Sequence, residues 1–62
     1  MSGYTVTHSI DIINEYCDNP KLYKEWQLRG AINDAWTHYQ YGNVSEAWYN
    51  FVVEKLSRYI KK

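Results

Sequence analysis

The stretch from Trp26 to Trp48 constrains the fold most, because two helical patterns meet there at a glycine. Apolar and aromatic residues recur at helical spacing as far as Tyr41, and the spacing restarts directly after Gly42-Asn43. A glycine at this point suits the left-handed residue that follows a helix C-terminus. A connection of so few residues makes the flanking helices antiparallel neighbours. The stretch therefore predicts a helical hairpin.

A shorter helix precedes this hairpin. The side chains of Ile10, Ile13 and Cys17 share one face at helical spacing, and Thr7 or Ser9 can cap the helix. Pro20 suits the first turn of the next helix, where its missing N–H costs nothing. We expect helices over residues 9–18, 20–41 and 44–60, with residues 1–7 forming a loosely held arm.

The apolar face of the second expected helix is too wide for one packing partner. Its first turns carry one patch, and its later turns carry a stripe offset from that patch. The patch consists of Leu22, Tyr23 and Trp26, and the stripe of Leu28, Ala31, Ile32, Ala35, Trp36 and Tyr39. We expect Trp36 to fill the core together with Trp48 and Phe51 of the third helix, and the patch to meet a second partner.

The chain is short enough that its core needs additional support. Sixty-two residues make one domain and leave much apolar surface uncovered, so folds of this size usually use a disulfide, a metal or self-association. Cys17 is the only cysteine, which excludes an internal disulfide and a closed site of several thiolates, and we expect it to be a small buried apolar side chain. The sequence thus predicts an all-α domain, a short N-terminal helix packed on a hairpin of two longer helices, that pairs into a homodimeric bundle.

The charge balance argues against a nucleic-acid-binding role. Seven basic and seven acidic residues give a formal net charge of zero, and the helix after the turn starts without the basic or amide side chains that read a groove. The basic residues gather at the end of the chain instead. Any contact with nucleic acid would use Lys55, Arg58, Lys61 and Lys62.

Few residues offer catalytic chemistry. Asp34 and His38 stand four apart and could form half of a metal site, but no second element completes a metal shell. A solvated pair on the polar side of the helix is the simpler interpretation, and we expect His8 to be exposed as well. No phosphate loop, nucleophile with a base, or pair of catalytic carboxylates is present. We therefore expect no enzyme activity, no metal and no cofactor.

Two features of the sequence bear on its location. No apolar run approaches the roughly 20 residues that span a bilayer, and the N-terminus MSGYTVTHS lacks the regions of a signal peptide. We expect no membrane association and a cytoplasmic protein.

The aromatic content is the strongest functional signal. Three Trp, seven Tyr and one Phe exceed what one small core can bury, and Trp and Tyr are enriched at protein interfaces. The expected role is therefore binding, either to a second copy or to a foreign protein. The candidate interface residues are Tyr23, Trp26, Tyr41, Tyr49 and Tyr59.

The run EWQLRGAINDAWTHYQYGNVSEAWYNFVVEKLSRYI, from Glu25 to Ile60, resembles the small helical accessory proteins of lambda-like phages that are encoded between the exonuclease and excisionase genes. The resemblance lies in size and in aromatic-rich helical character, and it carries no motif or functional residue. It implies a non-enzymatic phage or prophage protein that binds an unknown host or phage protein and biases phage development or host functions. The alternative is a small DNA-binding or excisionase-like regulator.

Overall fold

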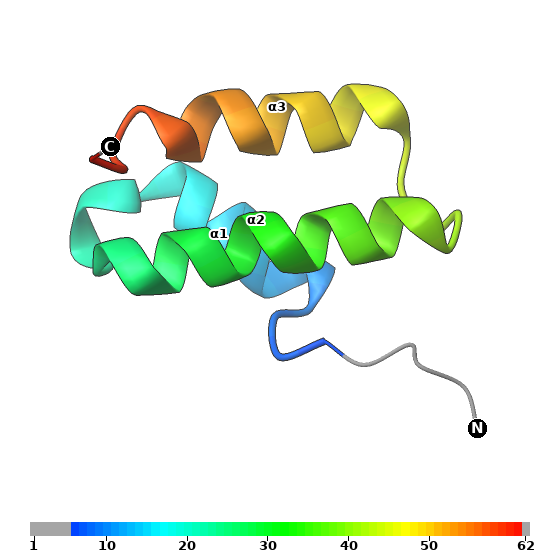
Figure 1. Cartoon of the computed structure of the whole chain (residues 1–62), viewed down its shortest axis with the longest axis horizontal. Coiled ribbons are helices and arrows are strands. Elements are labelled where there is room, and N and C mark those ends of the chain that lie inside the picture. The colour runs from blue at the N-terminus through cyan, green and yellow to red at the C-terminus, as the bar shows by residue number, and fades with distance from the viewer. Residues whose placement is uncertain (1–5, 62) are drawn as a thin grey trace.

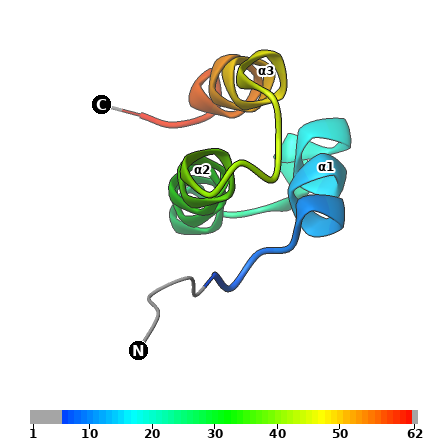
Figure 2. The ribbon, with the colours of Figure 1, turned by 90° about the vertical axis from the view of Figure 1, so that its right-hand side faces the viewer.

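The computed structural model describes residues 6–61. Three α-helices pack together: α1 (Ile10–Asp18), α2 (Glu25–Gln40) and α3 (Glu46–Ser57), with a single 3₁₀ turn at Pro20–Leu22. Helices α2 and α3 run antiparallel side by side, and α1 lies behind both in the view of Figure 1. Viewed along the helices, the three form a triangle in which α1 covers one side of the α2/α3 pair (Figure 2). The predicted all-α class is confirmed, and no strand occurs in the described part of the chain.

Helix α1 forms where the sequence predicts it. The Ser9 hydroxyl caps its first turn by accepting a hydrogen bond from the Ile12 N–H at 3.2 Å. Ile13, Tyr16 and Cys17 are its buried residues. Of the predicted flexible arm, residues 1–5 lie outside the described part of the chain. Thr7, at the other end of that arm, is hydrogen-bonded to α2.

The second helix begins five residues later than predicted, at Glu25 and not at Pro20. Tyr23 has an extended backbone, with φ −120° and ψ 153°, and its ring stacks on Tyr16 of α1 with the ring centroids 4.0 Å apart. Continuing the helix from Pro20 is incompatible with this backbone conformation. The new start is capped at Lys24, whose N–H donates to Gln27 Oε1 at 2.9 Å.

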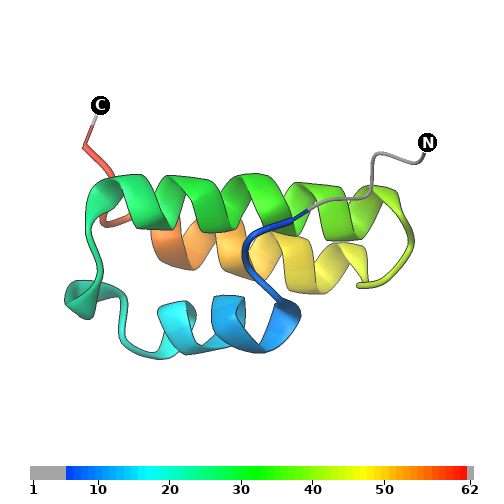
Figure 3. The same ribbon diagram turned by 90° about the horizontal axis from the view of Figure 1, so that it is seen from below.

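The hairpin turn is built as predicted at its glycine. Gly42 has a φ of +74°, and its N–H donates to the Tyr39 carbonyl at 3.0 Å. The third helix is shorter than the predicted range 44–60, because Ser45 caps it by accepting from the Trp48 N–H at 3.1 Å and the helix ends at Ser57. Figure 3 shows the turn closing one end of the α2/α3 pair, while α1 packs along its side.

We expect Gly42→Ala to destabilise the fold by about 1–2 kcal/mol, because a Cβ is disfavoured in the left-handed region. An added Cβ would meet no atom within 4 Å, so the backbone conformation alone sets the cost. Gly42→Asn should cost less, since asparagine tolerates this region. Urea unfolding measures both. Equal losses for Ala and Asn would show that the φ of residue 42 is not what matters.

The core lies where the three helices meet. Its fully buried members are Ile13 and Cys17 from α1, Leu28, Ala31 and Ala35 from α2, and Val52 and Leu56 from α3. The two alanines let the other helices approach α2 closely. Trp48 is partly buried against this cluster and donates its indole N–H to Asn14 Oδ1 at 2.8 Å.

The prediction that Trp36 and Phe51 fill the core is wrong. Trp36 is 45% exposed and Phe51 is 48% exposed. Leu28, Ala31 and Ala35 face the core on α2, which turns Trp36 toward the edge of the helix pair. On α3 the core residues are Val52 and Leu56, and Phe51 is rotated away from them by about 100° and about 140° respectively.

A groove between α2 and α3

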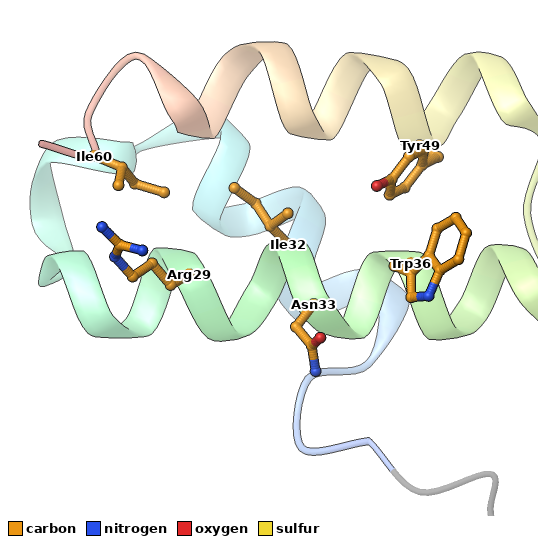
Figure 4. A pocket seen from close by; sticks show the side chains of 6 residues that line it. All are labelled: Arg29, Ile32, Asn33, Trp36, Tyr49 and Ile60. Carbon is orange, nitrogen blue, oxygen red and sulfur yellow. The ribbon is translucent and has the colours of Figure 1, made fainter. Parts of the chain in front are cut away.

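A groove of about 550 Å³ opens between α2 and α3, and α1 lies behind the helix pair in this view (Figure 4). Figure 4 shows Trp36 and Tyr49 approaching each other at one end, Ile32 in the middle, and Arg29 with Ile60 at the other end. The lining residues are Arg29, Ile32, Asn33, Trp36, Tyr49 and Ile60. The groove exists because α1 covers only one side of a helix pair that is apolar on both sides.

A cluster of three aromatic rings lies at one end of this groove, where Trp36 and Tyr49 line it and Tyr39 packs against both. Tyr39 and Tyr49 stack with their centroids 5.5 Å apart and their planes 13° from parallel. The ring centroid of Trp36 lies 5.8 Å from that of Tyr49 and 6.1 Å from that of Tyr39. Tyr39 and Tyr49 are half-buried, whereas Trp36 keeps nearly half its surface in solvent. We call this cluster of Trp36, Tyr39 and Tyr49 the aromatic ledge; its rings pack on one another, and Trp36 is the most exposed of the three.

Arg29 shapes the other end of the groove. Its guanidinium pairs with Glu25 at 2.9 Å and donates to the Lys61 carbonyl at 3.1 Å. The second bond holds the chain after α3 beside α2, next to Ile60. Arg29 is the one charged side chain among the groove residues. The groove thus offers apolar and aromatic surface with a single fixed cation, which suits another protein surface better than a charged small molecule.

The five predicted interface residues do not form one patch. Trp26 is 69% exposed on α2, and Tyr49 contributes to the groove. Tyr41 is 52% exposed at the turn and Tyr59 is 40% exposed after α3. Tyr23 is half-buried by its stacking on Tyr16.

Reasoning from the sequence missed the groove residues Arg29, Ile32, Asn33, Trp36 and Ile60. The excess width of the apolar face of α2 does indicate a second surface, but the spacing alone puts that surface at Leu22, Tyr23 and Trp26. A stripe broader than one core requires leaves its outer residues, Ile32 and Trp36, at the edge of the helix.

The basic residues named as possible nucleic-acid contacts are partly engaged. Arg58 pairs with Glu54 at 3.3 Å, and the Lys55 ammonium lies 6.0 Å from the centre of the Phe51 ring. Lys61 is exposed, and Lys62 lies outside the described residues. Neutralisation of Arg58 by Glu54 lowers the positive potential that a phosphate backbone would meet.

Asp34 forms the second notable constellation, and here the expectation of a solvated Asp34–His38 pair is wrong. Both residues are buried, with 7% and 5% exposed surface. One carboxylate oxygen of Asp34 accepts three hydrogen bonds, from the Thr7 N–H at 3.2 Å, the Thr7 hydroxyl at 3.0 Å and the His8 N–H at 3.0 Å. The same oxygen lies 2.6 Å from His8 Nδ1. His38 Nε2 lies 3.0 Å from the His8 carbonyl.

His8 is likewise not exposed as predicted, since only 14% of its side chain is accessible. Its ring packs edge-on against Tyr16, with centroids 5.2 Å apart, and close over Gly30. The Thr7–His8 segment therefore covers the polar side of α2. It does so through hydrogen bonds to Asp34 from residues that precede it by 26 or 27 positions in the sequence. The local spacing of Asp34 and His38 does not reveal these contacts.

The hydrogen bonds to Asp34 set its charge state. Burial by itself would raise the pKa of this carboxyl, but the hydrogen bonds from His8 and Thr7 outweigh burial and hold the pKa below its ordinary value. A carboxylate beside an imidazole can orient a base. Cys17 is buried, and burial raises the pKa of its thiol. Within residues 6–61 no three His, Cys, Asp or Glu residues are grouped to hold a metal.

Comparison of the chain with known protein families, with curated proteins and with solved structures finds no match. No helix in the described range is both long and apolar enough to cross a membrane.

Proposed function

We propose that this protein acts by binding other proteins, without catalysis, through the groove face of α2 and α3. The observation that carries the proposal is the groove itself, on the side of the helix pair that α1 leaves uncovered. Apolar and aromatic side chains line it together with Arg29 and Asn33, and the aromatic ledge lies at one end. Aromatic residues that are held rigidly and remain partly exposed are typical anchors of protein interfaces. Under this proposal, Trp36 and Tyr49 are the rings of the aromatic surplus that would contact the partner in the groove.

The resemblance to accessory proteins of lambda-like phages supports a more specific form of the proposal. In that form the chain is a phage or prophage protein whose contacts bias phage development or host functions. Producing the chain in host cells should then alter phage development or host growth, and Trp36→Ser should abolish the effect. A Phe51→Ser variant, which changes an equally exposed ring on the other side of α3, should retain it.

Photo-crosslinking in host cells tests the binding proposal directly. A benzophenone amino acid replaces Asn33, an exposed residue of the groove, or Glu15, an exposed residue of α1. We expect discrete protein adducts from position 33 and none from position 15. A crosslink to a second copy and a crosslink to another protein would both support the proposal.

The rival DNA-binding function predicts a different outcome. It requires no protein adduct at position 33, together with a salt-sensitive shift of duplex DNA that is lost when Lys55 and Arg58 are neutralised. That pair of results would overturn the proposal.

A further inference from the structure

The exposed face of α2 carries a short repeat that is typical of a helix seam. Trp26, Arg29, Asn33 and Trp36 follow one another at spacings of three, four and three residues. Projected at 100° per residue, they fall within about 80° of one another, on the side of α2 turned away from its core residues. Residues that repeat in this way form a continuous stripe along a helix, and such a stripe contacts a second helix over its full length. All four are exposed.

This stripe is symmetric about its own centre. Trp26 and Trp36 lie equally far from residue 31, and so do Arg29 and Asn33. When two copies of a helix pair antiparallel about a two-fold axis, each residue faces the one at the mirrored position. An axis at residue 31 therefore sets each Trp26 opposite the partner's Trp36, and each Arg29 opposite the partner's Asn33.

Resting on the binding function proposed above, we propose that the occupant of the groove face is a second copy of this chain, paired antiparallel through α2. Each Trp26 ring reaches the partner's aromatic end of the groove, formed by Trp36 and Tyr49. The contact completes a bundle in which the uncovered side of each α2/α3 pair is closed by the other copy.

The polar centre of the stripe suits this arrangement. Arg29 is already oriented by Glu25 and by the Lys61 carbonyl, so little side-chain freedom remains to be lost on pairing. The Asn33 side chain supplies a carbonyl oxygen that an opposing guanidinium can donate to. Polar residues at the centre of a seam, here Arg29 and Asn33 between two tryptophans, also fix its register and orientation.

The two exposed tryptophans supply a substantial share of the area that a dimer interface needs. Trp26 and Trp36 keep 69% and 45% of their surface exposed. A tryptophan buries about 150–250 Å², so these two rings alone supply on the order of 170–280 Å² from each copy. Ile32, Tyr49, Ile60 and the Arg29 stem add to this toward the roughly 600 Å² per partner at which specific interfaces begin.

Sedimentation equilibrium at micromolar concentration tests the pairing. The wild-type chain should show twice its 7.5 kDa mass. Trp26→Ser and Trp36→Ser should each weaken association by roughly 30-fold, as expected for anchoring aromatics, with helical content retained. Phe51→Ser is the matched control, because it removes a ring of similar exposure outside the stripe, and it should remain dimeric.

Disulfide trapping tests the orientation. A mixture of Arg29→Cys and Asn33→Cys chains should oxidise to a cross-linked heterodimer faster than either variant does alone, because only the mixture sets two thiols opposite each other within the 7 Å of Cα separation that a disulfide allows. Cys17 does not interfere, because it is 1% exposed.

A monomeric wild-type chain would overturn the inference, and so would a dimer in which Phe51→Ser is the disruptive change or only like variants cross-link. The binding function stands apart from these results: a monomer whose position 33 crosslinks to another protein would refute the self-pairing and leave the proposed function intact.

Discussion

Leu56→Ala should leave the chain largely unfolded at 37 °C. Leu56 has no exposed surface and joins α3 to the shared core of all three helices. Truncating a fully buried leucine costs about 2–5 kcal/mol through lost burial and the cavity left behind. A domain of this length has on the order of 3–9 kcal/mol of stability in total, so the loss removes much or all of it. Thermal unfolding followed by circular dichroism measures the effect.

The chain supplies its own matched control for that change. Leu22→Ala makes the same truncation at a residue that is 74% exposed in the 3₁₀ turn, and it should alter stability by no more than about 0.5 kcal/mol. Similar unfolding midpoints for the two variants would mean that α3 is not packed on the core as described.

Asp34→Asn should have the second largest effect, a loss of roughly 1.5–3 kcal/mol. The charged carboxylate receives hydrogen bonds from Thr7 and His8, and hydrogen bonds to a charged group are worth more than neutral ones. An asparagine keeps the shape of the side chain, but its amide oxygen is a weaker hydrogen-bond acceptor than a carboxylate. Its NH₂ group can also face the backbone N–H groups of Thr7 and His8, which cannot accept a hydrogen bond from it. Asp18→Asn is the control, because this exposed aspartate at the end of α1 should change stability little.

The same carboxylate predicts an acid limb in the stability curve. The folded-state pKa of Asp34 is depressed relative to the unfolded chain, so its contribution is present above the unfolded pKa and is lost as pH falls through the folded one. Stability of the wild type should therefore decline below about pH 4. The difference between wild type and Asp34→Asn should shrink over that range. A constant difference from pH 7 to pH 2 would contradict the assignment.

The sequence was sufficient for the order of the three helices and for the hairpin turn, because both depend on local chemistry. Ser9 and Gly42 act through hydrogen bonds or dihedral angles within a few residues of themselves. The break before α2 was missed because it depends on the stacking of Tyr23 on Tyr16. No helix-breaking residue near Tyr23 in the sequence indicates this contact.

The candidate site was harder to predict, because it depends on how each helix is rotated. Both apolar faces of α2 and α3 are broad, and Trp36 or Phe51 could face the core as well as Ala35 or Val52 by spacing alone. The small alanines decide the rotation through close packing, which is a property of the assembled helices. Burial of Asp34 likewise depends on Thr7 and His8, which are distant in the chain.

The hydrogen bond from Arg29 to the Lys61 carbonyl has a practical consequence for handling this protein. It ties Lys61 to Arg29, which lines the groove together with Ile60. An affinity tag or fluorescent fusion attached at the carboxyl end would therefore emerge next to the surface under study and could block it sterically. Binding experiments are better served by small labels on the exposed side of α1, for example at Glu15.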